Sequence, residues 1–333
     1  IVFGFVAASL LTPSTSMLDD GAILGVAVAG LAASLLVLYI SWRIWFLSGE
    51  QNEMRPLNFF RPFKLFSKVT LVEGDARSPP VRRFTFELPA NTSLSSLGFD
   101  LGLGSFVKVS PPRGLARPYS PTSDVNRLGS FDLTVKIYPG GNVSGFLDRL
   151  LVGESALCSG PGPVPWIRMC RRGGGISFGL VAFGVGITEI FEIAKAELTR
   201  SACQRVLLLW ANRSWSDVFD VETINAVASA SGGRLQIIHL LSREQREGCL
   251  QGRISVEVLK EAFAPLLDGS LDKAALRFLA VGTRGMKVHT AQCLSELGFT
   301  SSAMLLCKSP GLPCRSRRRS VASSASEKPK NYA

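Results

Sequence analysis

The stretch Arg117-Pro118-Tyr119-Ser120, which stands between Pro111-Pro112 and the alternating run Phe131 to Tyr138, decides the fold. Arginine offers a planar fork of donors that matches a diphosphate, and Pro118 fixes the backbone beside it. The ring of Tyr119 can then stack on a flat ligand, and the Ser120 hydroxyl can hydrogen-bond a ring nitrogen. On these four residues alone, a plain turn at a sheet edge would explain the stretch as well.

The order of the motifs downstream favours the binding site over the plain turn. A glycine-rich loop, Gly140 to Ser144, leads into the helical run Gly145 to Leu151, and such a loop can cradle phosphate. We expect Ser144 to cap that helix. Next comes Gly184-Val185-Gly186-Ile187-Thr188, in which we expect Thr188 to cap the helical stretch Glu189 to Thr199. The last motif is Val281-Gly282-Thr283-Arg284-Gly285-Met286.

In order and spacing, these motifs resemble the ferredoxin-NADP reductase superfamily, and they are most similar to its membrane-anchored NAD(P)H-cytochrome b5 reductases. The resemblance covers roughly residues 62–308. It implies an antiparallel β-barrel that binds FAD and an α/β parallel-sheet domain that binds NAD(P)H. It also implies an oxidoreductase that passes electrons through the flavin to a one-electron acceptor, such as cytochrome b5 or another small acidic electron carrier.

The resemblance also implies roles for single residues. Arg117 would hold the FAD diphosphate, Tyr119 would stack on the isoalloxazine, and Ser120 would be the catalytic residue at the reactive ring nitrogen. The full FAD set that it implies is Arg117, Pro118, Tyr119, Ser120, Val135, Lys136, Tyr138, Gly141, Asn142, Val143, Ser144 and Thr188. The NAD(P) set is Gly184, Gly186, Ser242, Arg243, Gly282 and Met286.

The chain departs from the family pattern at the nucleotide motifs. Phe183 adds bulk before the Gly-x-Gly turn, Val185 removes a hydroxyl, and Glu189 puts a negative charge at a helix start that should face a diphosphate. The run from Val281 to Met286 lacks the cysteine that the family places at the nicotinamide. A second interpretation therefore stays open, in which the chain is a weakened or inactive reductase-like structural subunit of a membrane complex.

The total composition restricts the compartment and the partners. The 333 residues carry a net charge of +11, and residues 308–333 hold seven basic residues against one acidic residue. This suits an acidic protein or an anionic membrane surface, and we expect no nucleic-acid partner. Seven scattered cysteines without a Cys-x-x-Cys pair favour a reducing compartment. His239 and His289 lie in apolar stretches, so we predict packed histidines and no metal site.

Residues 21–47 are predicted to form a transmembrane anchor. No charge occurs from Gly21 to Trp42, a length that spans about 30 Å of hydrocarbon as a helix. A signal peptide is the alternative, but Asp19-Asp20 would give it an acidic leading flank. Basic residues follow the span, so the positive-inside rule predicts the later domains in the cytosol, on the endoplasmic reticulum or the mitochondrial outer membrane.

The remaining boundaries follow from hydrophobic period and composition. We expect an N-terminal segment (1–20), a linker (48–61), the FAD-binding barrel (62–172), the NAD(P)-binding domain (173–308) and a disordered basic tail (309–333). In Val81 to Leu88 and Phe131 to Tyr138 apolar residues alternate, which is typical of barrel strands. In the second run this alternation leaves Lys136 and Tyr138 on the face opposite the apolar residues. After Ile176, continuous apolar runs alternate with helical segments, which indicates a parallel sheet.

The choice of nicotinamide nucleotide is predicted from the segment after the strand Leu235 to Leu241. NADH-using relatives place an acidic residue there, which bonds the ribose hydroxyls and repels a 2′-phosphate. This chain has Ser242-Arg243-Glu244-Gln245, which resembles the NADPH-using members of the superfamily. We therefore predict NADPH over NADH, with use of both left open, and with a simple polar turn as the alternative.

Overall fold

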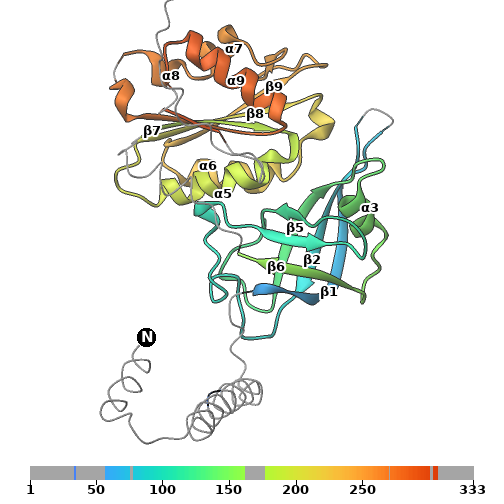
Figure 1. Ribbon diagram of the computed structural model, residues 1–333. Coiled ribbons are helices and arrows are strands. Elements are labelled where there is room, and N and C mark those ends of the chain that lie inside the picture. Colours follow the sequence, from blue (N-terminus) through green and yellow to red (C-terminus); the bar gives the residue numbers. More distant parts are fainter. Residues whose placement is uncertain are drawn as a thin grey trace, which may run out of the picture. The chain divides into compact units, whose positions relative to one another are not determined.

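A computed structural model describes residue 34 and residues 57–75, 78–161, 177–269, 271–300 and 303–306. Two six-stranded sheets form the body of the described chain, one antiparallel and one parallel (Figure 1). The predicted span and the basic tail lie outside the described residues, apart from Ser34, which is helical. No helix in the described ranges is long and apolar enough to cross a bilayer.

The first domain is an antiparallel sheet with strand order β4-β3-β6-β1-β2-β5. An isolated bridge between Pro121 and Leu133 joins the segment after β4 to β5, so the sheet curls into a barrel. Its elements are β1 (Leu57–Val72), β2 (Val81–Glu87), η2 (Leu101–Leu103), β3 (Val107–Ser110), β4 (Arg117–Tyr119), β5 (Ser130–Lys136), α3 (Asn142–Arg149) and β6 (Ser155–Gly160). The predicted antiparallel barrel is confirmed, and β1 begins at Leu57, inside the range predicted as linker.

The barrel interior is filled by the apolar positions that the alternation predicted. Phe84 and Phe86 on β2 and Phe131 and Leu133 on β5 are fully buried in one cluster. Phe86 and Phe131 are partners in the β2–β5 register, and their rings stack 5.5 Å apart. The opposite face of β5 points away from the barrel core, and Lys136 at the end of this strand lines a cavity outside the barrel.

The second domain is a parallel sheet with strand order β10-β9-β8-β7-β11-β12. Its strands are β7 (Ser177–Phe183), β8 (Arg205–Asn212), β9 (Leu235–Leu241), β10 (Leu250–Gln251), β11 (Leu276–Val281) and β12 (Met304–Leu306). Its helices are α5 (Ile187–Leu198), α6 (Val221–Ala230), α7 (Val256–Ala262), α8 (Ala264–Leu267) and α9 (Arg284–Glu296), with short turns η3 (Gly184–Gly186), η4 (Trp215–Asp217) and η5 (Lys273–Ala275).

Helices cover both faces of this sheet, α5 and α6 on one and α7 to α9 on the other (Figure 1). The strand β8 shows why its sequence is continuously apolar. Val206, Leu208 and Trp210 pack in one cluster, while Leu207 and Leu209 pack in the cluster on the other face. The predicted parallel sheet is confirmed. Ligands of such sheets bind at the carboxyl ends of the strands, so a binding site is expected at that edge.

Candidate functional site

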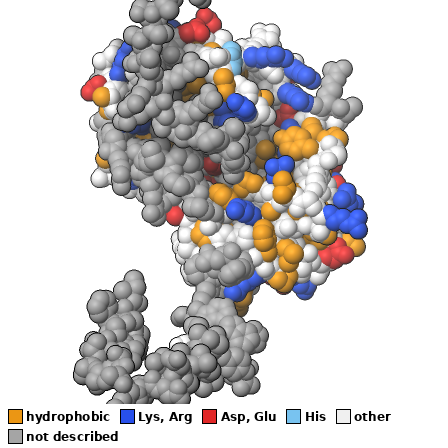
Figure 2. All heavy atoms as spheres, in the orientation of Figure 1, with side chains coloured by type: hydrophobic (Ala, Val, Ile, Leu, Met, Phe, Trp, Pro, Cys, Tyr) orange, Lys and Arg blue, Asp and Glu red, His pale blue; other side chains and the backbone are white. Residues whose placement is uncertain are grey.

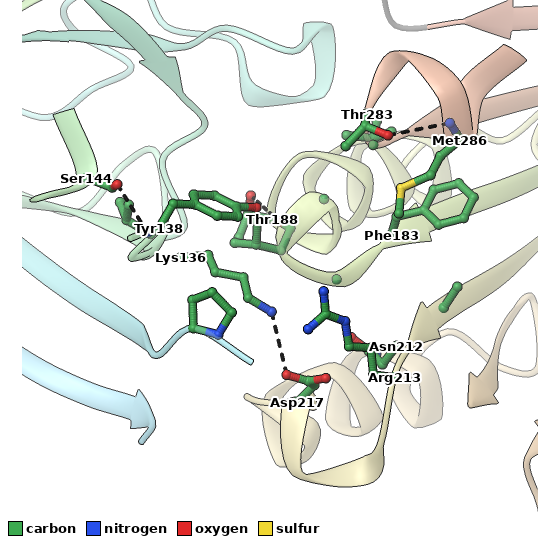
Figure 3. Close-up of a pocket in the computed structure, with 18 of the residues that line it drawn as sticks. Lys136, Tyr138, Ser144, Phe183, Thr188, Asn212, Arg213, Asp217, Thr283 and Met286 are labelled. Atoms are coloured by element: carbon green, nitrogen blue, oxygen red, sulfur yellow. Dashed lines mark hydrogen bonds and ion pairs between the residues drawn. The ribbon is translucent and has the colours of Figure 1, made fainter. Parts of the chain in front are cut away.

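A large cavity lies where the barrel meets the carboxyl ends of the parallel strands. The barrel side is lined by β4, the end of β5 and the loop into α3, and the other side by the residues that follow β7, β8, β9 and β11 (Figure 3). Its volume of about 1750 Å³ exceeds the roughly 300–1,000 Å³ of a usual single-ligand pocket. The cavity therefore has room for more than one ligand.

Every site residue named from the sequence lines this cavity. They are Arg117, Pro118, Tyr119, Ser120, Val135, Lys136, Tyr138, Gly141, Asn142, Val143, Ser144, Gly184, Gly186, Thr188, Ser242, Arg243, Gly282 and Met286. They come from segments more than 160 positions apart, so the fold brings together what the sequence keeps separate. Which atoms of FAD or NAD(P)H each residue contacts stays a prediction.

Tyr119 is held firmly in the cavity wall by β4. Its backbone pairs with Val107 of β3, and its ring packs against the barrel core. Burial raises the pKa of the Tyr119 phenol to about 12, although the positive charge of Arg117 opposes that rise. The hydroxyl therefore remains a neutral donor at physiological pH, and the ring keeps a fixed orientation.

The loop before α3 has the shape of an anion cradle. Gly140 has φ +70°, and a Cβ on Gly141 would come 2.2 Å from Ser144 Oγ and 3.0 Å from the Tyr138 carbonyl oxygen. The first turn of α3 leads from this loop, so its unpaired backbone N–H groups belong to the cavity wall. Together with the Arg117 guanidinium, these residues fit the diphosphate of FAD.

The predicted cap of this helix is wrong. Gly141 stands at the N-cap position, and no side chain caps α3. The Ser144 hydroxyl lies one turn further on and accepts a hydrogen bond from the Tyr138 N–H at 3.3 Å. Ser144 thus ties the loop to the end of β5, which holds Tyr138 at the cavity (Figure 3).

The turn after β7 needs its glycines because β11 approaches it closely. Gly184 has φ +53°, and a Cβ on Gly186 would lie 2.7 Å from the Val281 carbonyl oxygen. The predicted Thr188 cap is also wrong, because α5 begins at Ile187 and Thr188 Oγ1 donates to the Val185 carbonyl oxygen at 3.0 Å. Thr188 nevertheless lies in the cavity wall across from Tyr138 (Figure 3).

Asn212, which sequence reasoning missed, ends β8 inside the cavity wall. Its side chain is 8% exposed, and neither its amide nitrogen nor its amide oxygen has a hydrogen-bond partner within the described chain. A buried polar group without a partner is costly, so this amide is well suited to hold a bound nucleotide. The available signal was a polar residue directly after the apolar run Val206 to Ala211.

Two carboxylates of the second domain hold cations of the barrel. Lys136 Nζ lies 3.5 Å from Asp217 Oδ1, and it also donates to Ser78 Oγ at 3.3 Å (Figure 3). Ser78 Oγ itself donates to Asp217, and Arg83 pairs with Asp220. Asp217 is 4% exposed, so this cluster stabilises the contact between the two domains at the cavity.

The residues after β8 and β9 run side by side. The Ser242 N–H donates to the Asn212 carbonyl oxygen at 3.1 Å, and the Arg243 N–H donates to the Arg213 carbonyl oxygen at 2.8 Å. Both arginines line the cavity. This part of the cavity wall is therefore cationic, and it contains a serine where an acidic residue would repel a phosphate.

His239 is packed as predicted, whereas His289 is exposed, so the prediction of a packed histidine is wrong for His289. His239 lies 5.6 Å from the ring of Trp210 and 4.9 Å from that of Trp215, and burial lowers its pKa. His289 reaches the Ile254 carbonyl oxygen at 2.9 Å from the cavity edge. Within the described segments, no three His, Cys, Asp or Glu side chains are placed to hold a metal ion.

Comparison with known protein families agrees with this geometry. Residues 68–163 match the family described as "Oxidoreductase FAD-binding domain", and residues 180–292 match "Oxidoreductase NAD-binding domain". NADH-cytochrome b5 reductase 1 of Aspergillus fumigatus is 30% identical over 250 residues, which cover 71% of this chain and 76% of that protein. The chain belongs to the ferredoxin-NADP reductase superfamily.

Further relatives are named cytochrome b5 reductase or nitrate reductase. NADH-cytochrome b5 reductase 1 of Arabidopsis thaliana is 28% identical over 291 residues, which cover 85% of this chain and 95% of that protein. Nitrate reductase [NADPH] of Aspergillus niger is 28% identical over 74% of this chain, but the match spans only 30% of that longer protein. The chain is thus an FAD- and NAD(P)-binding oxidoreductase of this superfamily.

Solved structures share the fold at lower identity. The cytochrome b5 reductase-containing domains of human Ncb5or, in an NAD⁺ form, superpose with a TM-score of 0.59 at 22% identity over 75% of this chain and 70% of theirs. A ferredoxin NADP⁺ reductase from Neisseria gonorrhoeae with bound FAD and NADP gives a TM-score of 0.59 at 17% identity, over 74% of this chain and 97% of its own.

Proposed function

We propose that the chain is a membrane-anchored reductase that takes electrons preferentially from NADPH and delivers them to cytochrome b5 or a similar small acidic haem protein. Bound FAD supplies the chemistry that converts a two-electron donor into single-electron deliveries. The chain's own residues bind and orient: Arg117 and the α3 start hold a diphosphate, and Tyr119 stacks on a ring. The opposite wall presents the nucleotide to the same cavity.

The preference for NADPH rests on the paired loops after β8 and β9. Their backbone bonds hold the main chains of Arg213 and Arg243 next to each other, and Ser242 and Arg243 both line the cavity. The Arg243 guanidinium and the Ser242 hydroxyl match the oxygens of a 2′-phosphate. Glu244, the nearest carboxylate in sequence, is instead bonded to the Trp215 N–H at 2.7 Å and does not line the cavity.

Steady-state kinetics with both nucleotides test this preference. Replacing Arg243 with Ala should lower kcat/KM for NADPH about ten- to a hundred-fold, since a hydrogen bond to a charged group contributes about 1.5–3 kcal/mol. The value for NADH should change little. Arg205→Ala is a matched control, because this exposed arginine lies at the opposite end of β8. A preference for NADH that Arg243→Ala leaves unchanged would refute the assignment.

The partner and the membrane anchor are supported by the relatives and by the sequence. Several relatives are named NADH-cytochrome b5 reductase, and residues 21–42 contain no charge. Removing residues 1–47 should release the protein from membranes without loss of reduction of an artificial acceptor, because the described residues that line the cavity all lie between Asp75 and His289. Continued membrane binding of the shortened chain would point to the basic tail instead.

A second function is favoured by the cavity wall near β7 and β11. Phe183 lies against Gly282, where a Cβ would meet its ring at 2.7 Å, and Glu189 adds a carboxylate to the cavity. These residues take space and add negative charge where a dinucleotide is expected. A chain with weakened hydride transfer, kept as a structural subunit, would retain flavin but would not be bleached by either nucleotide.

A further inference from the structure

One outer face of the barrel is unusually apolar for a surface. Among the described residues, six of the eleven exposed large hydrophobic side chains lie on β1, β6 and the turn before β6. They are Phe60, Phe66, Val69, Leu151, Val152 and Leu157. Exposed apolar side chains that gather in one place mark an interaction site more often than scattered ones do.

The strand register explains why these side chains share one face. Along β1, Phe63 and Leu65 point into the barrel core, so Phe60, Pro62, Lys64 and Phe66 alternate outward. Leu157 of β6 is the register partner of Pro62. The turn is fixed beside Phe66, because the Gly153 N–H donates to the Leu65 carbonyl oxygen at 2.8 Å.

This face, called here the β1–β6 face, consists of Phe60, Pro62, Lys64, Phe66, Leu151, Val152 and Leu157. Hydrophobic side chains with Lys and Arg among them are visible on the surface of the barrel (Figure 2). The face lies opposite the cavity around the barrel. β6 and β1 are the middle strands of the order β4-β3-β6-β1-β2-β5, whereas β4 and β5, which line the cavity, meet at its ends.

The charges on and around the β1–β6 face favour an anionic surface. Arg61, Lys64 and Lys108 are exposed there. Of the described carboxylates nearby, Glu87 is paired with Lys64 at 3.7 Å, Asp148 is paired with Arg82 at 2.7 Å, and Glu154 accepts a hydrogen bond from the Leu151 N–H at 2.8 Å. Apolar side chains flanked by basic residues are typical of surfaces that lie in the headgroup region of a bilayer.

We propose that the β1–β6 face docks on the lipid bilayer, so that the cavity opens toward the aqueous phase. This inference rests on the proposed membrane anchor. Only residues 43–56 separate the uncharged stretch from β1, and extended they span at most about 50 Å. A tether of that length keeps the barrel at a high effective concentration near the membrane. Docking then leaves the cavity accessible to a nucleotide and to a soluble electron carrier.

Photo-crosslinking of the full chain in vesicles of phosphatidylcholine and phosphatidylserine tests this orientation. A benzophenone amino acid replaces Phe66 in one protein, Val152 in a second and Val288 in a third. Val288 is the control, because it is exposed on α9 of the other domain. After flotation and irradiation, mass spectrometry should find lipid adducts at positions 66 and 152 at least ten times more often than at 288.

Each other outcome overturns the proposal. If the chain floats with the vesicles but positions 66 and 152 label no more lipid than 288, docking is wrong while the anchor stands. If the adducts at 66 join two copies of the chain, the face is a self-association surface. If the full chain does not float at all, the proposed anchor fails, and docking that depends on it fails as well.

Discussion

Replacing Asp217 with Asn should loosen the contact between the two domains. The Asp217 side chain is 4% exposed, and its carboxylate lies 3.5 Å from Lys136 Nζ and also accepts a hydrogen bond from Ser78 Oγ. The substitution keeps the shape of the side chain and removes its charge. The Lys136 ammonium, 14% exposed, then loses its described counter-charge and keeps only neutral partners, such as the Ser78 hydroxyl at 3.3 Å.

The magnitude follows from the burial of the pair. Removing one partner of a buried ion pair costs about 3–5 kcal/mol, but Lys136 Nζ faces a cavity that admits water, so about 2 kcal/mol is expected. At roughly 2–4 °C per kcal/mol for a domain of this size, the first melting transition should fall by about 4–8 °C. Glu87→Gln is the control, because its 3.7 Å pair with Lys64 is half-exposed and contributes under about 1 kcal/mol.

The coupling between the two groups comes from calorimetry of three variants: Asp217→Asn, Lys136→Met and the double variant Asp217→Asn/Lys136→Met. We expect the double variant to be less destabilised than the sum of the single variants by about 1–2 kcal/mol. If Asp217→Asn melts with the parent protein, or if the two effects simply add, the pair does not stabilise the domain contact and the reasoning is refuted.

Two further predictions concern Arg117 and Tyr119. Replacing Arg117 with Ala should weaken FAD about ten- to a hundred-fold, as expected for loss of a charge-assisted bond of about 1.5–3 kcal/mol; flavin retained through dialysis as in the parent would contradict this. Burial raises the pKa of Tyr119 to about 12, so flavin binding should not change between pH 7 and 10 through ionisation of this phenol. A loss of flavin near pH 10 that Tyr119→Phe abolishes would show that the phenol titrates normally.

Much of the fold could be predicted because its strands follow simple periods. The alternation in β2 and β5 correctly identified the buried residues Phe84, Phe86, Phe131 and Leu133. The long strand β1 was not predicted, because register shifts between Leu65 and Ser67 and between Thr70 and Val72 interrupt its period. A β-bulge of this kind changes which face a residue occupies, so no single alternation runs through the strand.

The cavity could be predicted only where a motif is local. The Arg117 to Ser120 stretch and the glycine-rich turns lie in the cavity wall as expected. The caps by Ser144 and Thr188 were wrong, since both hydroxyls bond backbone groups nearby instead. The Lys136–Asp217 pair and the partnerless amide of Asn212 depend on how the two domains meet, and no short sequence pattern records that contact.

The most direct test of the account is the flavin spectrum of the purified full chain under anaerobic conditions, before and after addition of NADPH. The arrangement of Arg117, Tyr119, Ser242 and Arg243 predicts a bound flavin whose visible absorbance bleaches with NADPH, and faster than with NADH. A protein that purifies without flavin and does not take it up, or that holds flavin which neither nucleotide bleaches, would contradict the central claim that this cavity is the active site of a reductase.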